Sequence, residues 1–461
     1  MSIFLRSIRI LSLMTLMVFI MVPSASAATL TEIAEKAEKA ADALSEGLEV
    51  VKDKLTSDSE TSAPTETVAN IEFDSSKTAA AAGAINAFTL DLYGKLSEKE
   101  KGNLFFSPYS IVSALGMTYA GASGNTAAEM EKVLHFKGPE IHASMGALIS
   151  RYESLPEKSG VLATANRLWP SKDEKLRFPY VRLLKDDYRS DVAALDFAVD
   201  PDGARKAVNA WVEEKTKGKI KDLLEGPDVG KDTVLILTNA IYFNSLWAYP
   251  FDAKETKSLP FFVAKGKTVD LPTMSRKERF SYGEADGVQF VKLPYKVPGV
   301  SMLVLLPRTT DKFDQMQLLE QKLSGANGLK TLERWISTME LQRVNVWLPK
   351  FEQEQRFSLK DTLEALGMQD AFSAKADFSG IFEPEENRNV PVFINAVIHQ
   401  TFVAVDEEKT EAAGATAVGI QKMSIALPED SVDFRADHPF LYLIMDDATG
   451  TILFMGRQTF N

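Results

Sequence analysis

Two adjoining segments near the C-terminus, 397-VIHQTFVAVD-406 and 410-TEAAGATAV-418, decide the fold hypothesis. The first is rich in β-branched and aromatic residues and predicts a strand. The second lacks the large apolar side chains that anchor in a core and the proline and high charge of a solvated loop. With the strand period of two, Thr410, Ala412, Gly414, Thr416 and Val418 share one face, and Glu411, Ala413, Ala415 and Ala417 share the other. Such a segment could slide into a crowded, preformed sheet; the alternative is a small-residue surface loop or linker.

Around these segments, globular patterning runs from about Thr78 to the C-terminus. Helical stretches come first, at 78–96 and 110–120, and a hairpin at 440–456 closes the chain. Strand-like runs dominate in between, at 233–243, 287–294, 300–307, 343–349 and 392–406. The strands and helices alternate without a regular βαβ rhythm, which predicts an α+β fold.

The first 27 residues have the pattern of a secretory signal. Arg6 and Arg9 precede an uncharged, mostly apolar run at 10–22, and Ala25-Ser26-Ala27 supplies the small residues that a signal peptidase needs. An uncleaved membrane anchor is the alternative, but the apolar run is short for a bilayer. We therefore expect a secreted protein, extracellular or periplasmic, whose mature form does not span a membrane.

Residues 28–77 are predicted to be a helical spacer followed by a flexible linker. Between residues 30 and 55, apolar residues recur at alternating steps of four and three, as in a heptad repeat. An oligomerising helix is one interpretation; alanines in the stripe and Gly47 favour a solvated spacer helix instead. Residues 56–77 are rich in Ser, Thr, Glu and Asp. The predicted organisation is thus a signal at 1–27, a spacer and linker at 28–77, and one domain at 78–461.

Composition excludes several classes of function. The chain has no cysteine, so disulfides, thiolate metal sites and cysteine nucleophiles are excluded. Its four histidines have no metal-ligand spacing, and we expect neither a metal nor another cofactor. A net charge of −12 disfavours nucleic acid as a partner. The absence of cysteine and of Asn-x-Ser/Thr sites favours a bacterial or archaeal envelope over a eukaryotic secretory route.

Enzyme motifs are absent as well. The sequence has no GxSxG elbow, no GxxxxGK phosphate loop and no GxGxxG after a strand. A Ser-His-Asp triad is not disproved, and a broad activity screen of the purified protein would test for a hydrolase. We predict that the protein is not an enzyme.

Seven motifs in order resemble the serpin family across the predicted domain. They are 103-NLFFSPYSI-111, 238-TNAIYF-243 with Trp247 and Pro250-Phe251, 348-LPKF-351, 366-LGMQDAF-372 with 376-ADFSG-380, the segment 407–417, 437-DHPF-440, and 454-FMG-456. The resemblance implies a large central mixed β-sheet with further sheets, about nine helices and an exposed reactive-centre loop. It also implies a mechanism, in which a serine protease cleaves the loop as bait, the upstream half inserts into the sheet, and the covalently attached protease is trapped.

The resemblance also implies the site residues. The hinge of the loop matches Glu407, Glu408, Lys409, Thr410, Glu411, Ala412, Ala413, Gly414, Ala415, Thr416 and Ala417. The shutter, where the sheet must open, matches Ser107, Ser110, Asn239 and His399, and the breach, where insertion starts, matches Trp247. Without the resemblance, His399 is equally a satisfied strand histidine and Trp247 a core tryptophan.

The bait bond follows from the family spacing of about 17 residues from Glu407, which reaches Met423–Ser424. Methionine favours elastase-, chymotrypsin- or subtilisin-like proteases, whereas a register slipped to Lys422 would favour trypsin-like ones. Lys409 departs from the family pattern, in which glycine is usual at this position. By strand parity Lys409 faces solvent while Thr410 enters the sheet, so we expect an inhibitor. A non-inhibitory serpin acting as a carrier or chaperone is the alternative.

Overall fold

The computed structural model describes residues 74–156, 160–308, 315–384, 392–408 and 430–460. These residues belong to one compact unit that begins at Asp74. Asp74 caps a 3-10 turn, Ser75–Lys77, just before the first long helix at Ala79. No helix within the described ranges is long and apolar enough to cross a membrane. The predicted signal and nearly all of the spacer and linker lie outside the described residues.

The described residues form nine α-helices and two β-sheets, which confirms the α+β prediction. The helices are α3 (Ala79–Lys99), α4 (Pro108–Tyr119), α5 (Gly124–Val133), α6 (Glu140–Glu153), α7 (Phe178–Tyr188), α8 (Pro201–Lys215), α9 (Gln315–Leu323), α10 (Gly328–Ser337) and α11 (Lys360–Leu366).

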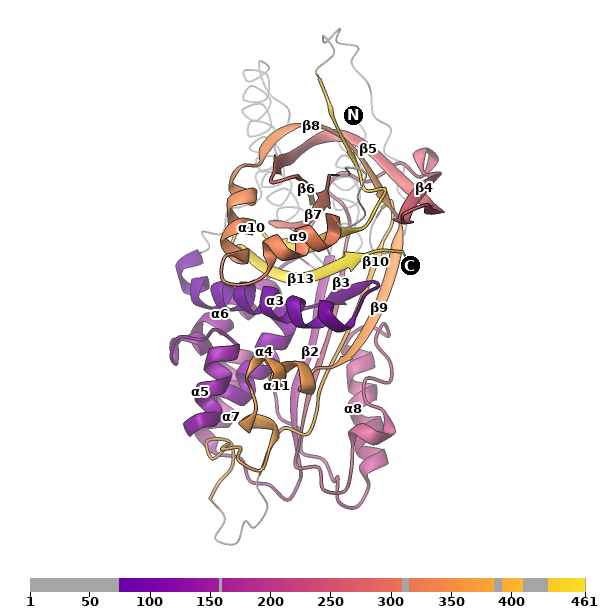
Figure 1. The fold of residues 1–461 in the computed structure, drawn as a ribbon. Coiled ribbons are helices and arrows are strands. Elements are labelled where there is room, and N and C mark those ends of the chain that lie inside the picture. Colours follow the sequence, from indigo (N-terminus) through magenta and orange to yellow (C-terminus); the bar gives the residue numbers. More distant parts are fainter. Residues whose placement is uncertain (1–73, 157–159, 309–314, 385–391, 409–429, 461) are drawn as a thin grey trace, which may run out of the picture. The chain divides into compact units, whose positions relative to one another are not determined.

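The four-stranded sheet runs in the order β2-β3-β10-β9 and is mixed (Figure 1). Its strands are β2 (Gly160–Pro170), β3 (Leu235–Ser245), β10 (Val397–Val405) and β9 (Phe351–Ser358). β3 pairs in parallel with β10, whereas β2 and β9 pair antiparallel to their neighbours. Between β3 and β10 the chain passes through β4 to β9, so this parallel pair joins segments about 160 residues apart.

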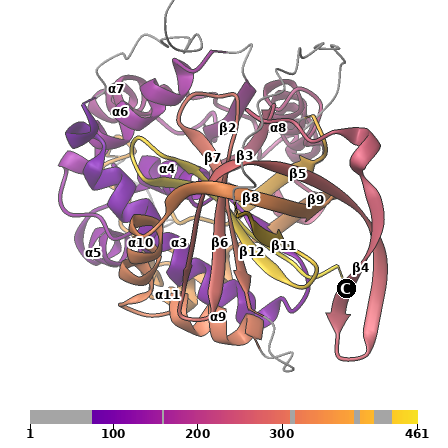
Figure 2. The same ribbon diagram turned by 90° about the horizontal axis from the view of Figure 1, so that it is seen from above.

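The nine-stranded sheet covers the upper part of the domain in Figure 1, and Figure 2 looks down on it. Its order is β1-β13-β12-β7-β6-β5-β8-β11, with β4 paired to β5. Its strands are β1 (Leu104–Phe106), β4 (Lys257–Ala264), β5 (Lys267–Ala285), β6 (Val288–Pro294), β7 (Val300–Pro307), β8 (Glu340–Pro349), β11 (Val432–Arg435), β12 (Phe440–Asp446) and β13 (Thr451–Gln458).

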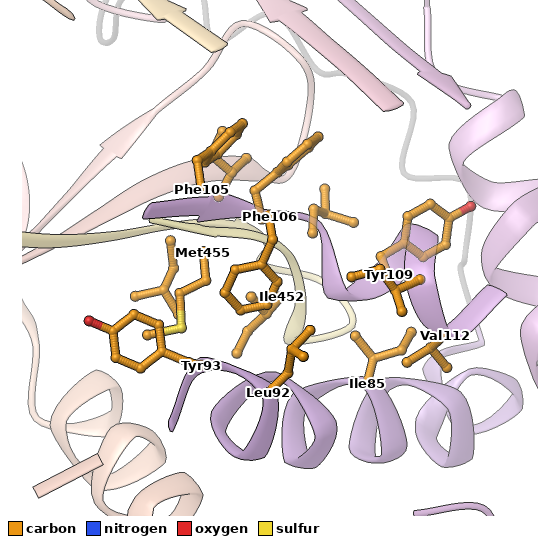
Figure 3. Packing of buried hydrophobic residues seen from close by; sticks show 14 of the residues in the cluster. Ile85, Leu92, Tyr93, Phe105, Phe106, Tyr109, Val112, Ile452 and Met455 are labelled. Carbon is orange, nitrogen blue, oxygen red and sulfur yellow. The ribbon is translucent and has the colours of Figure 1, made fainter. Parts of the chain in front are cut away.

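The main core lies between α3, α4 and the strands above them. Ile85 and Leu92 on α3 pack toward Phe106 and Ile452, as Figure 3 shows, and all four are fully buried. The buried start of α4 suits its sequence, because Ser107 caps the helix through its side chain and Pro108 occupies the first turn. α4 is therefore fixed beneath the four-stranded sheet.

A second apolar cluster covers the other face of that sheet. Val208 and Val212 of α8 pack with Ala240 of β3 and Ile398 of β10. Figure 1 shows α8 on one side of the four-stranded sheet and α4 to α7 on the other. Both faces of the β3–β10 pair are thus buried, as is usual for parallel strands.

The predicted strand at 392–406 needs one correction. Its first five residues belong to no strand, and β10 begins only at Val397. Ile394 instead donates its amide to the carbonyl of Ala371, which ties this apolar segment to the loop after α11. Apolar patterning therefore marked burial correctly but not sheet pairing.

Candidate functional site

The parallel pair β3–β10 separates at one end. Its register runs from Val397 opposite Leu237 to Phe402 opposite Tyr242. Beyond Phe402, residues 403–405 of β10 pair only with β9, and residues 243–245 of β3 pair only with β2. The sheet therefore opens between its two central strands, at the end from which the chain continues into the 407–417 segment.

Trp247 lies at this opening and holds the first residues after β10. Its indole Nε1 donates to the carbonyl of Asp406 over 2.9 Å, and its amide donates to the carbonyl of Glu408 over 3.2 Å. The indole is buried and stacks on Tyr295, with ring centroids 4.4 Å apart. Trp247 is thus both a core residue and a direct contact of the chain that leaves the sheet.

Glu407 is fixed by three elements at the same place. Lys350 lies 2.6 Å from its Oε2, Thr256 donates to its Oε1 over 2.7 Å, and Phe251 donates its amide to the Glu407 carbonyl over 2.8 Å. Burial opposes ionisation of this carboxyl, but the hydrogen bonds from Lys350 and Thr256 outweigh it and hold the pKa of Glu407 below its ordinary value. These contacts fix the starting point of the segment that follows.

The predicted shutter residues meet beneath the paired part of β3 and β10. His399 and Asn239 are cross-strand partners, and the His399 Nδ1 contacts the Asn239 Oδ1. Asn239 donates to the Ser110 hydroxyl over 2.7 Å, and the backbone amide of Ser110 donates to the Ser107 hydroxyl over 3.2 Å. All four side chains are fully buried. The network ties both central strands to the start of α4.

Asn166 on β2 completes this network. It lies directly opposite Asn239, and its Oδ1 accepts hydrogen bonds from Asn239 over 2.9 Å and from Ser110 over 3.1 Å. From the sequence, Asn166 and Thr256 were not predicted as site residues, and Lys350 appeared only within the motif 348-LPKF-351, without a role. An asparagine inside the apolar run 160–170 was the available signal for the first, but the partners of the other two follow only from the folded register.

The hydrogen bonds of His399 define its protonation state. The amide of Ser107 donates to Nε2 over 3.0 Å, so Nε2 must be an unprotonated acceptor. Nδ1 therefore carries the proton and donates to Asn239. Burial lowers the pKa of His399 to about 3, opposed in part by its bond to Asn239. The ring is neutral in the folded protein at every pH near neutrality.

This neutral histidine predicts a pH dependence of stability. Because the folded pKa lies below that of an unfolded histidine, the contribution of His399 is fully present above about pH 6.5 and is lost as pH falls toward 3. Between pH 6.5 and 5, we expect the free energy of unfolding of the parent to fall by about 2 kcal/mol more than that of His399→Asn. Urea unfolding at both pH values measures this difference. Equal losses in the two proteins would contradict the assignment; His142, which is also buried, is present in both.

The remaining predicted site residues lie outside the described residues. They are the hinge positions Lys409 to Ala417 and the bait positions Lys422, Met423 and Ser424. The described ends of this segment are Glu408, fixed by Trp247, and Asp430, just before β11. In the part of the chain that the structure describes, no group of three or more acidic or histidine side chains is placed to hold a metal ion.

Comparison with known proteins identifies the family of this chain. The family model described as serpin (serine protease inhibitor) matches residues 83–459. The chain belongs to the serpin family. The match spans both sheets and all seven motifs, so the serpin resemblance of the sequence is confirmed.

Individual serpins match over most of their length. A serpin-like protein of Thermococcus kodakarensis is 38% identical over 380 residues, covering 81% of this chain and 84% of the relative. The leukocyte elastase inhibitor of Bos taurus is 38% identical over 379 residues, covering 80% of this chain and 96% of the relative. Among solved structures, human thyroxine-binding globulin complexed with thyroxine has 30% identity and a TM-score of 0.71, covering 82% of this chain and 98% of that one.

Proposed function

We propose that this serpin inhibits serine-type endopeptidases by inserting its cleaved loop between β3 and β10 and trapping the protease covalently. The observation that carries the proposal is the opening of the parallel pair beside the anchored residues Asp406 and Glu408. A chain that leaves β10 there and turns back would run antiparallel to both central strands. Similarity to the leukocyte elastase inhibitors, at 38% identity, supports a protease as the partner.

The proposed chemistry consumes one peptide bond of the inhibitor. The protease serine hydroxyl attacks the carbonyl of Met423, the bond to Ser424 breaks, and the new amino terminus of Ser424 leaves with a proton. The acyl-enzyme then carries residues up to Met423 on the protease. Insertion of residues 409–417 draws the protease along before water can release it. The protein itself acts as bait and not as a catalyst.

Strand pairing supplies the driving force for insertion. In the closed sheet, β3 and β10 share one short parallel interface of six partnered residue pairs. An inserted strand replaces this interface with two antiparallel ones. Antiparallel pairing is slightly more stable per residue, and two interfaces have about twice as many backbone hydrogen bonds between strands as one. The small side chains predicted on both faces of 410–418 suit a site already covered by α4 and α8.

Covalent trapping predicts a complex that survives SDS. We expect incubation with an elastase-, chymotrypsin- or subtilisin-like protease to give a band near the summed masses. N-terminal sequencing of the released fragment should begin at Ser424. A fragment beginning at Met423 would place the bait at Lys422 and make trypsin-like enzymes the targets. Cleavage by every protease without any SDS-stable band would contradict inhibition.

A non-inhibitory carrier is the second candidate. Its specific support is the likeness to a solved thyroxine-binding globulin, together with a hollow of about 420 Å³ between α3 and α10. Leu329, Ile336 and Met445 give this hollow apolar walls, and Lys292 lies at its edge. The SDS experiment separates the two candidates, because a carrier forms no covalent complex with a protease.

Export is proposed from the N-terminal sequence. Residues 1–27 would be removed as a signal, leaving a secreted, extracellular or periplasmic serpin, and the lack of cysteine supports a prokaryotic envelope. Residues 30–55 could join copies of the chain through their heptad stripe. Purified mature protein should begin at Ala28, and sedimentation of the chain with and without residues 28–73 tests the oligomer.

A further inference from the structure

The outer face of β5, β8 and β11 gathers positive charge on an acidic protein. Lys277 and Arg279 on β5, Arg343 on β8 and Arg435 on β11 are all exposed, while alternate residues such as Val344, Val346 and Phe434 are buried. We call these four residues the basic face. The chain as a whole has a net charge of −12, so this concentration of cations is opposite in sign to the rest of the molecule.

Strand register brings the basic face together. Arg279 is the direct cross-strand partner of Arg343, and Lys277 lies opposite Asn345. Asn345 and Trp347 in turn lie opposite Asp433 and Arg435 of β11. The β5–β8 register therefore places two positive charges, Arg279 and Arg343, directly opposite each other on the exposed side of the sheet.

Three further side chains define the character of this surface. The Arg435 guanidinium lies 3.8 Å from the centroid of the Trp347 ring and 3.1 Å from the Asp433 carboxylate, which fixes its position. Leu341, at one end of the same face, is 61% exposed. On the opposite side, Asp252 and Glu255 line a hollow beside Lys277 and limit the positive region there. Lys277 also acts electrostatically on Asp433 and contributes to holding the pKa of that carboxyl below its ordinary value, after the hydrogen bonds from Asn345 and Arg435.

We propose that the basic face is a docking surface for an acidic patch on the target serine protease. The proposal rests on the proposed inhibitory function. β11 follows the bait segment in the sequence, and Val432 is nine residues after Met423, a reach of at most about 30 Å. A protease domain on the order of 40 Å across, engaged at the bait, therefore lies within reach of this face. Figure 1 shows β5 and β8 at the top of the domain, and β11 pairs with β8 at the edge of the same sheet.

A protein partner suits this face better than a polyanion. Asp433 interrupts the cations, Leu341 adds apolar surface, and the net negative charge of the chain repels extended anions. Protein interfaces use such mixtures of arginine, tryptophan and apolar side chains. Charges of this kind act mainly on the rate of encounter and little on the chemistry that follows.

The test compares rates of inhibition at two salt concentrations. The variant Lys277→Gln/Arg279→Gln/Arg343→Gln is matched by Lys132→Gln/Lys137→Gln/Lys185→Gln, which removes the same charge on α5, α7 and the turn after α5. The targets are two serine proteases that cut the bait, one acidic and one basic. At 50 mM salt we expect the first variant to inhibit the acidic protease about tenfold more slowly than the parent, and the control variant to match the parent. The difference should vanish at 0.5 M salt, and the stoichiometry of inhibition should not change.

The outcomes separate this proposal from the proposed function. Equal rates for the parent and the basic-face variant would overturn the docking surface while leaving covalent trapping intact. If the basic-face variant no longer binds dextran sulfate but inhibits the acidic protease at the parent's rate, the basic face binds polyanions. That result would also overturn the docking surface. If the parent traps no protease, the proposed function fails, and binding of the acidic protease with its serine replaced by alanine then tests the face alone. Equal affinity of parent and variant in that assay would overturn the docking surface. The double variant Lys277→Gln/Arg279→Gln serves if the triple variant does not fold.

Discussion

Cleavage of the bait between residues 418 and 424 should raise the melting temperature by about 20 °C. An inserted strand would gain on the order of ten net backbone hydrogen bonds across β3 and β10, each contributing about 1 kcal/mol. For a domain of this size, each kcal/mol raises the melting temperature by about 2 °C. A nicked surface loop normally gains nothing, so the sign of the change is diagnostic. Limited proteolysis followed by differential scanning calorimetry measures it, and an unchanged or lower melting temperature would mean that no strand is added.

The second large effect concerns Thr410, the first hinge residue whose side chain is predicted to turn into the sheet. Both faces of the β3–β10 pair are buried by α4 and α8, so an arginine there would bury an unpaired charge. That costs at least several kcal/mol, and each 1.4 kcal/mol on the insertion barrier slows insertion about tenfold. Hydrolysis of the acyl-enzyme would then win, and Thr410→Arg should consume about ten or more inhibitor molecules per protease inactivated.

Lys409→Arg is the matched control for this variant. The side chain at 409 is predicted to stay in solvent. The stoichiometry of inhibition of Lys409→Arg should therefore equal that of the parent. Cleaved Thr410→Arg should also lack the rise in melting temperature, which links the two predictions. Inhibition by Thr410→Arg as efficient as that of the parent would show that insertion does not proceed through this hinge.

Strands made of continuous apolar runs could be predicted from the sequence. Strands in which charged and apolar residues mix could not. The runs that became β3, β7 and β12 are buried along almost their whole length, and β6 alternates between buried and partly buried residues. β5 was missed although it is 19 residues long, because charged and apolar residues mix along it and it pairs with different strands at its two ends. Its pattern reflects local exposure in a twisted sheet, which composition alone does not show.

The candidate site was likewise predictable only in part. The family resemblance indicated Ser107, Asn239 and His399, and the structure brings them together as a hydrogen-bonded network. Asn166 and Lys350 were not predicted as site residues, because their roles depend on partners that only the fold brings close. Asn166 depends on the β2–β3 register, and Lys350 pairs with Glu407, 57 residues away. The hinge beyond Glu408 and the bait remain predictions from the sequence.

In this mechanism, β3 and β10 must separate before the protein can inhibit a protease. A disulfide that joins the two strands tests this requirement most directly. Ala240 and Gln400 are ladder partners in the parallel pair, and ladder partners lie about 5 Å apart, within disulfide range. The chain has no cysteine of its own, so Ala240→Cys/Gln400→Cys introduces the only pair. The single variants control for the substitutions. We predict that the reduced protein forms the SDS-stable complex, while the oxidised protein is cut at the same bond and releases active protease. Equal yields of complex from the oxidised and reduced forms would contradict insertion between these strands.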